Sequence, residues 1–145
     1  MPEAAAITVL PVDASNWREV AGLKVKRKQR AFVAEPSYYL SLCAYSQWNP
    51  LAVYLETAVI GFMMWAKDDD SHWLGGILLD KRFQGKGFGR LAVLATLDYL
   101  RASQGARSFA LSYQADNLTA KQLYMSLGFT ETGEVEDNEV VARLK

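Results

Sequence analysis

A glycine-rich stretch between residues 84 and 90 holds the residues whose chemistry is easiest to interpret. Gln84-Gly85-Lys86-Gly87-Phe88-Gly89-Arg90 places three glycines at alternate positions, with two cations beside them. Glycines allow positive φ and let a ligand come close to main-chain N–H groups. Where such a turn opens into a helix, unpaired N–H groups and the helix dipole favour a phosphate. The stretch predicts a phosphate-binding loop, and a plain tight turn is the alternative.

The glycine spacing excludes two familiar kinds of phosphate loop. A P-loop requires a glycine where this chain has Asp80, and a Ser or Thr where it has Gly87. A dinucleotide-binding fingerprint requires its third glycine where this chain has Arg90. A phosphate-binding loop here would therefore belong to another class.

The segments around this loop have the patterns of regular structure. Residues 73–79 form a short apolar run typical of a buried strand, and residues 91–104 have helical spacing that stops at Gly105. Residues 108–113 predict a further strand. Because a helix joins the two strands, we expect them to pair in parallel through a right-handed crossover.

A second motif lies toward the C-terminus, where residues 117–129 read Asn-Leu-Thr-Ala-Lys-Gln-Leu-Tyr-Met-Ser-Leu-Gly-Phe. Together with Gln84-x-x-Gly87-x-Gly89 it resembles the GCN5-related N-acetyltransferases (GNAT). Their pyrophosphate loop reads Gln/Arg-x-x-Gly-x-Gly/Ala, and their next helix ends Leu-Tyr-x-x-x-Gly-Phe. The motifs stand in the family's order and at its separation. The chain looks most like the polyamine-acetylating branch at residues 62–64, 80–87, 132–134 and 139–141.

The resemblance, which covers residues 51–144, implies an α/β fold with a mixed sheet of roughly six or seven strands, about four helices and a splayed parallel strand pair. Acetyl-CoA, the family's co-substrate, would lie in that opening against unpaired backbone groups of Ile77, Leu78 and Leu79. The other residues that the resemblance assigns to acetyl-CoA are Gln84, Gly85, Lys86, Gly87, Gly89, Arg90, Asn117 and Lys121. A helix N-cap is the alternative role for Asn117.

The implied reaction is acetyl transfer to a primary amine by direct attack on the thioester. It requires donors for the developing oxyanion and a proton for the departing thiolate. The backbone N–H near Leu78 or Leu79 is the expected oxyanion donor. Tyr124 matches the family tyrosine beside the CoA sulfur, where a phenol with a pKa near 10 can protonate a thiolate. A core tyrosine is the alternative reading of Tyr124.

The general base has no clear candidate in the sequence. Some family members carry a His or Glu at positions that match Trp73 or Gly75, and neither of these side chains can take a proton. The alternatives are ordered water, relayed by His72, Glu35 or Glu134, and an amine that binds already neutral.

Because the chain resembles the polyamine-acetylating branch, small polyamines lead the list of acceptors, and a site for them would need carboxylates and aromatic walls around the ammonium groups. The candidate acceptor residues are Glu35, Tyr38, Tyr39, Trp73, Glu134 and Glu139. The polyamine branch tends to carry a carboxylate near Cys43, and its absence here argues against polyamine specificity. The alternatives are a protein N-terminus or lysine as acceptor, a non-catalytic CoA-binding module, and a nucleic-acid-binding domain built on the basic run from Lys24 to Arg30.

Length and composition set broader limits. With 145 residues, of which 50% are hydrophobic, the chain suits a single domain over residues 1–145. Sixteen basic and sixteen acidic residues leave no net charge to steer the protein toward nucleic acid or an anionic membrane. We expect a cytoplasmic enzyme with a small-molecule partner and no metal, and we keep a homodimer as an option.

The remaining patterns predict the rest of the elements. Asn16 and Glu19 have the spacing of a capping box, so a helix should begin there. The basic run would be a solvated helix face, and contact with a ligand phosphate or nucleic acid is the alternative. A second helix is expected over residues 36–45. The expected strands are residues 7–10, the hairpin 51–55 with 58–65, and the closing hairpin 129–134 with 139–144.

Overall fold

The computed structural model describes residues 6–145. Its strands are β1 (Ile7–Pro11), β2 (Asn49–Leu55), β3 (Ala58–Lys67), β4 (His72–Leu79), β5 (Phe109–Tyr113), β6 (Thr130–Glu136) and β7 (Glu139–Leu144). Its α-helices are α1 (Trp17–Ala21), α2 (Pro36–Ala44), α3 (Phe88–Gln104) and α4 (Leu118–Ser126), and its 3₁₀ helices are η1 (Arg27–Ala31) and η2 (Lys81–Phe83).

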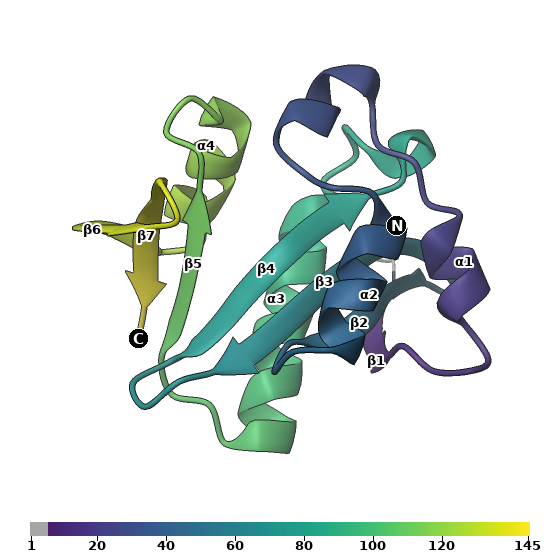
Figure 1. Cartoon of the computed structure of the whole chain (residues 1–145), viewed down its shortest axis with the longest axis horizontal. Helices are drawn as coiled ribbons and strands as arrows, with labels where there is room; N and C mark the ends of the chain where they lie inside the picture. The colour runs from purple at the N-terminus through teal and green to yellow at the C-terminus, as the bar shows by residue number, and fades with distance from the viewer. Residues whose placement is uncertain (1–5) are drawn as a thin grey trace, which may run out of the picture.

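The seven strands form one mixed sheet in the order β1-β2-β3-β4-β5-β7-β6. All neighbours are antiparallel except β4 and β5, which run parallel and pair only at His72 with Phe109 and at Trp73 with Ala110. Beyond Trp73 the two strands diverge, as Figure 1 shows. The expected splayed pair is confirmed, and we call the space between its open ends the fork.

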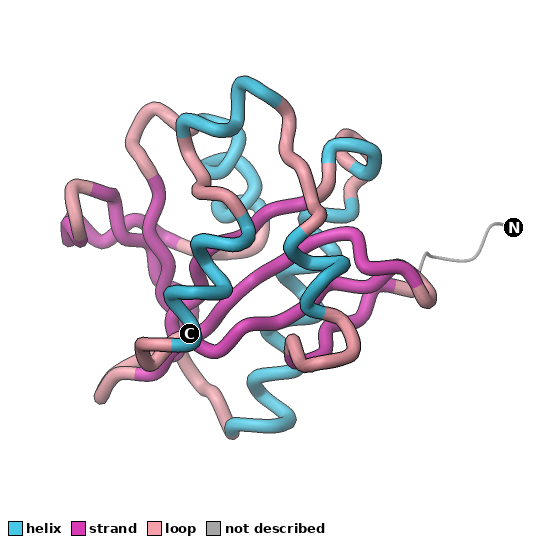
Figure 2. The backbone as a smooth tube through the Cα atoms, turned by 45° about the vertical axis from the view of Figure 1, so that its right-hand side comes forward, coloured by secondary structure: helices cyan, strands magenta, loops and turns pink. Residues whose placement is uncertain are grey.

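Helices cover both faces of the sheet (Figure 2). On one face α3 packs over a core that includes Leu51, Ile60, Leu97 and Phe109. On the other face α1 and α2 cover a smaller apolar cluster centred on Phe62. Burial of these two faces against helices is what stabilises the layered arrangement.

A bulge in β4 sits beside the fork. Phe62 pairs with Leu78 and Met64 with Gly75, so Gly76 and Ile77 together face the one intervening residue of β3. Gly76 has a φ of 58°, and a Cβ there would stand 3.2 Å from the Phe62 ring. Only glycine fits this position well, and bulges of this kind raise the local twist of a strand.

The N-terminal helix begins after Asn16, as the sequence predicts, but the prediction that it continues through the basic run is wrong. Helix α1 ends at Ala21, and the Asn16 side chain makes no cap but accepts a hydrogen bond from the backbone of Asp13 at 2.8 Å. The basic run lies instead on an extended segment and η1. The backbone of this segment forms hydrogen bonds with the loop after β4. The Lys24 N–H donates to the Asp80 carboxylate, and the Lys24 carbonyl accepts from the Lys81 N–H.

Candidate active site

The phosphate loop joins the open end of β4 to the start of α3. Gly85 and Gly87 have φ values of 76° and 83°, and a Cβ at either position would meet nothing within 4 Å. Gly87 is the N-cap of α3 and carries no side chain to satisfy the first N–H groups of the helix. A 17-residue helix therefore points its positive end at an open glycine turn, which is the arrangement that binds phosphate.

The Gln84 side chain stabilises this loop through hydrogen bonds within the protein, rather than pointing toward a bound ligand. Its Nε2 donates to the Leu79 carbonyl at 2.8 Å and to Gln29 Oε1 at 2.8 Å, while its Oε1 accepts from Gln29 Nε2 at 2.8 Å. The side chain is thus engaged by the protein, and the backbone of the loop is the part left to meet a ligand.

The basic run lies next to the same loop. The buried Asp80 carboxylate accepts hydrogen bonds from the Lys24 N–H and the Arg82 guanidinium at 3.1 and 2.8 Å. Burial opposes its ionisation, yet the hydrogen bonds from Arg82 and Lys24 prevail and lower its pKa. The side chains of Lys26, Arg27, Lys28, Arg30, Lys86 and Arg90 are all exposed on these neighbouring segments.

Asn117 and Lys121 lie on α4. Asn117 caps the helix, because its Oδ1 accepts from the Ala120 N–H at 3.3 Å, and its Nδ2 makes no hydrogen bond to any described residue. The N-cap role is confirmed, and the free amide leaves room for a ligand contact as well. The Lys121 ammonium pairs with Glu131 at 3.8 Å.

Tyr124 on α4 packs in the hydrophobic core near the end of β5, and 6% of its surface is exposed. Its ring stands 5.7 Å from that of Tyr113 and 6.0 Å from that of Phe129. Its hydroxyl makes no hydrogen bond to the residues described. Burial raises the pKa of this phenol, with smaller contributions from Tyr113 and Glu139, so it stays protonated at neutral pH.

Glu139 approaches the fork from the start of β7. Its carboxylate accepts a hydrogen bond of 2.8 Å from the Ser112 hydroxyl of β5. The negative charge of Glu139 raises the pKa of Tyr124, and it also adds to the effect of burial in raising the pKa of Tyr39 on α2. Glu139 therefore lies within electrostatic reach of both tyrosines.

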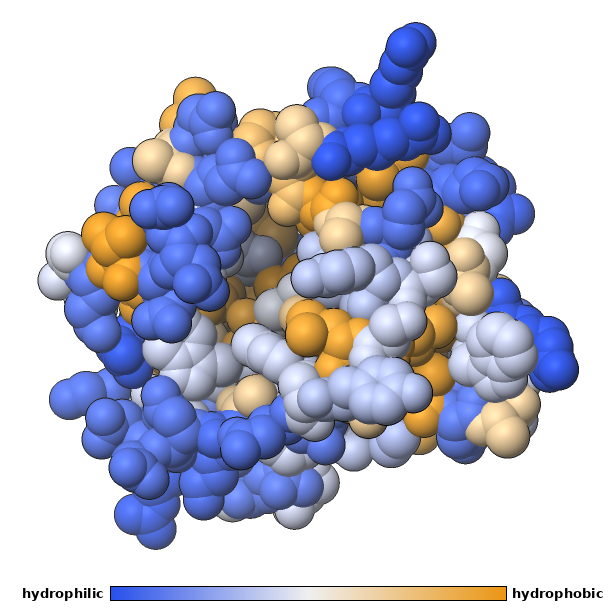
Figure 3. All heavy atoms as spheres, viewed as in Figure 1, coloured by the Kyte–Doolittle hydropathy of each residue, from blue (hydrophilic) through white to orange (hydrophobic). Residues whose placement is uncertain are grey.

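An open pocket adjoins Glu139 at the tip of the β6–β7 hairpin. Its lining consists of Gln114, Ala115, Asp116, Asp137, Asn138 and Glu139. Among these side chains there are three carboxylates and no cation, so the pocket attracts positive charge. Figure 3 shows that this face of the molecule is recessed between the β5–β7 side and the α2 side.

The structure does not bring Glu134 and Trp73 to this group. Glu134 forms a two-pronged ion pair with Arg143 at 2.7 and 2.8 Å, and hydrogen bonds from Arg143 and Thr132 lower its pKa to about 2. The Arg143 guanidinium also lies 5.3 Å from the Trp73 ring, whose Nε1 donates to Asp68 at 2.7 Å. These side chains fasten the hairpins together at the closed end of the fork.

The two tyrosines of α2 differ in their placement. Tyr39 stacks on Phe62 with ring centroids 5.8 Å apart, and its hydroxyl accepts from the Ala34 N–H at 3.0 Å. Tyr38 is 60% exposed and meets Tyr39 edge to face. Glu35 precedes α2, is exposed and makes no cap hydrogen bond. Of the three, Tyr39 is the one whose pKa is raised in part by the charge of Glu139.

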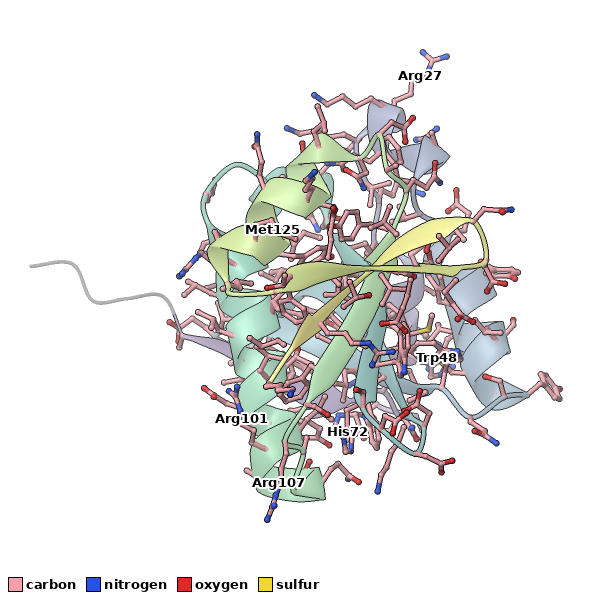
Figure 4. The ribbon with its side chains drawn as sticks, turned by 90° about the vertical axis from the view of Figure 1, so that its left-hand side faces the viewer. Arg27, Trp48, His72, Arg101, Arg107 and Met125 are labelled. Carbon is pink, nitrogen blue, oxygen red and sulfur yellow. The ribbon has the colours of Figure 1, made fainter. Side chains whose placement is uncertain are left out.

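No side-chain base occupies the middle of β4. A Cβ at Gly75 would stand 3.1 Å from the ring of Trp48, which sequence reasoning did not single out. His72 is buried at the closed end of the fork, and Figure 4 places it far from Arg27 of η1. A relay through His72 would therefore start from the closed end of the fork.

A family model for the "Acetyltransferase (GNAT) family" matches residues 17–129. The chain belongs to this family. The GNAT enzymes use acetyl-CoA as co-substrate, so the protein is an acetyl-CoA-dependent N-acetyltransferase by family, as expected from its two motifs.

Individual acetyltransferases are similar to this chain in sequence or in structure. A spermine/spermidine N(1)-acetyltransferase of Bacillus subtilis is 27% identical over 144 residues, which cover 92% of this chain and 93% of that protein. A spermidine N-acetyltransferase of Vibrio cholerae, solved with CoA and spermine, superposes with a TM-score of 0.72 at 20% identity, covering 94% of this chain and 92% of that one. An aminoglycoside acetyltransferase solved with coenzyme A superposes with a TM-score of 0.76 at 16% identity, covering 97% and 95%.

The residues present fit acetyl-CoA. The glycine turn at the start of α3 offers unfilled space and free N–H groups to a pyrophosphate, and Ile77, Leu78 and Leu79 lie beyond the last β4–β5 pair. Among residues 6–145, no group of His, Cys, Asp and Glu side chains could hold a metal ion. None of the described helices has both the length and the apolar character needed to cross a membrane.

Proposed function

We propose that this GNAT enzyme acetylates a small polyamine at the fork, between Tyr124 and Glu139. The observation that carries the proposal is that β4 and β5 part beyond Trp73, and that their open ends lie beside a protonated phenol and an acidic pocket. The curated relatives named for spermine and spermidine support the same acceptor.

Acetyl-CoA supplies the acetyl thioester when bound. The amine nitrogen forms a bond to the acetyl carbon and gives up one proton to water, the carbon–sulfur bond breaks, and the leaving thiolate takes up a proton. Tyr124 is the donor, since its hydroxyl has no partner among the described residues and its position matches that of the tyrosine beside the CoA sulfur in the family. The backbone N–H near Leu78 or Leu79 is the proposed oxyanion donor.

The acidic pocket holds the distal ammonium groups of the acceptor. The second helix, where the polyamine branch tends to carry a carboxylate, has Cys43 in contact with Met64 at 3.8 Å. Glu139, Asp116 and Asp137 supply negative charge from the opposite side of the fork instead. A polyamine with one neutral nitrogen and two or more charged ones fits this arrangement better than a monoamine.

The charges of the molecule are segregated in a way that suits both substrates. Exposed cations gather on residues 24–30 and 81–90, beside the phosphate loop, and neither of these two segments contains an Asp or Glu. Carboxylates gather on the β6–β7 hairpin. An anionic co-substrate and a cationic acceptor are therefore attracted to different ends of the fork.

The test is release of CoA thiol from acetyl-CoA in the presence of a panel of amines. The panel contains spermidine, spermine, butylamine, a peptide with a free N-terminus and a lysine peptide with a blocked N-terminus. We expect the largest kcat/KM for spermidine or spermine. A larger kcat/KM for a peptide than for both polyamines would indicate that the acceptor is a protein. Binding of acetyl-CoA without any turnover would indicate a non-catalytic CoA-binding module.

A further inference from the structure

The side chains of Gln29 and Gln84 form a closed pair. Each amide donates to the other's oxygen at 2.8 Å, and Gln29 Oε1 accepts a further hydrogen bond from the Lys26 N–H at 3.2 Å. The two residues are 55 positions apart in sequence and both are partly buried. Paired amides of this kind fix both side chains, because each oxygen and each NH₂ group has a partner.

The pair matters because the phosphate loop has few other restraints. No side chain packs on the faces of Gly85 and Gly87 where a Cβ would be. The loop is secured at its start by Asp80, which caps η2, and at Gln84, whose Nε2 also holds the Leu79 carbonyl. Loss of the partner of Gln84 would leave the loop with more conformations than the one that binds phosphate.

The segment that carries Gln29 is itself held on both sides of the fork. On the β4 side Gln29 bonds Gln84, and on the β5 side the Ala31 carbonyl accepts from Gln114 Nε2 at 3.2 Å. Helix η1 buries none of its own residues, so these polar contacts rather than a core keep it in place. The segment then continues to α2 and Tyr39.

We infer that Gln29 is a positioning residue for acetyl-CoA, which acts by holding Gln84 and with it the phosphate loop in the binding conformation. The inference rests on the proposed use of this loop for acetyl-CoA. Gln29 does not need to touch the ligand, because its effect passes through two side-chain hydrogen bonds and the backbone of the loop. Each such bond contributes modestly, so the effect is a shift in affinity rather than loss of the fold.

The experiment is a double-mutant cycle read by calorimetry with acetyl-CoA. Gln29→Leu should raise the Kd about 5- to 50-fold. Gln84→Leu should have an effect at least as large, and Gln29→Leu with Gln84→Leu should bind no more weakly than Gln84→Leu alone, because the two residues act as one unit. At saturating acetyl-CoA the kcat of Gln29→Leu should remain within about twofold of the parent value.

Gln104→Leu is the matched control. Gln104 is exposed at the far end of α3 from the loop and makes no side-chain hydrogen bond within residues 6–145, so its Kd should equal that of the parent. Thermal melts show whether each variant is folded, and Gln29→Ala serves as a second probe of the same bonds.

The outcomes separate this inference from the proposed function. A Kd for Gln29→Leu within twofold of the parent, or fully additive effects in the cycle, would overturn the inference. A parent that binds acetyl-CoA but acetylates no amine would overturn the proposed function, while the calorimetric cycle would still decide the role of Gln29. A parent that does not bind acetyl-CoA would overturn both.

Discussion

The Glu139 carboxylate lies close enough to the Tyr124 phenol to influence its ionisation. Burial raises the pKa of the phenol most, and the negative charge of Glu139 adds to that effect. Tyr124 belongs to the core cluster under α3, whereas Ser112, which binds Glu139, alternates with the core residues Leu111 and Tyr113 and so faces the other side of the sheet. The two functional groups therefore approach the fork from opposite faces.

Tyr124→Phe tests the proposed proton donor. It removes one hydroxyl that has no partner among the described residues, so the core packing should be kept. We predict that kcat falls by about 10- to 10⁴-fold while the Kd for acetyl-CoA changes little. The measurement is pre-steady-state release of CoA thiol. Equal rates in variant and parent would show that Tyr124 is a structural residue and not the proton donor.

Glu139→Gln tests the binding of the acceptor amine, and Glu134→Gln is its control. Glu139 lines the acidic pocket, whereas Glu134 is committed to Arg143. We predict that Glu139→Gln raises the KM for spermidine several-fold more than the KM for butylamine, because only the polyamine loses a distal ion pair. Glu134→Gln should leave both KM values near those of the parent, and an equal effect of Glu139→Gln on the two amines would contradict the pocket's role.

Gly87→Val tests the phosphate loop, and Gly105→Val is its matched control. Both glycines have positive φ, 83° and 65°, and both have open space where a Cβ would be. Each substitution should lower the free energy of unfolding by about 1–2 kcal/mol or slightly more, through backbone strain alone. Only Gly87→Val should abolish binding of acetyl-CoA in calorimetry. Undiminished affinity in a folded Gly87→Val protein would remove the loop from the binding site.

The lowered pKa of His72 makes the stability of the fold depend on pH. Burial and then the charge of Lys67 lower its pKa, and its Nε2 is buried without a hydrogen-bond partner among the residues described. The unfolded chain therefore binds a proton more readily, near pH 6.5, so stability is retained above that pH and is lost as the pH falls toward the folded-state pKa. Urea melts at pH 7.5 and 5.5 should show this loss in the parent, and His72→Phe should reduce it. The same loss in His72→Phe would assign it to other groups.

The sequence was sufficient to predict the elements that local pattern determines. The apolar run before Asp80, the glycine turn and the helix that ends at Gly105 were all expected, and so were the parallel pair and the closing hairpin. Each of these depends on hydrophobic period or on glycine chemistry, which neighbouring residues set.

The parts that could not be predicted depend on contacts between distant residues. The Lys24 segment has helix-forming residues, but its backbone hydrogen bonds go to Asp80 and Lys81 instead of to its own turns. Trp48 fills the space beside Gly75, and Glu134 is occupied by Arg143, for reasons of register that no local pattern reveals. Glu134 and Glu139 looked equivalent in the sequence, and only the pairing of β7 with β5 and β6 distinguishes them.

The most direct test of the account is to mix the purified protein with acetyl-CoA and spermidine and to measure released CoA thiol and acetylated product together, the latter by mass spectrometry. We predict one mono-acetylated spermidine for each CoA released, with both signals strongly reduced in Tyr124→Phe and saturation at a lower concentration of spermidine than of butylamine. Release of CoA without acetylated amine, or no release with any amine while acetyl-CoA binds, would contradict acetyl transfer to a polyamine at the fork.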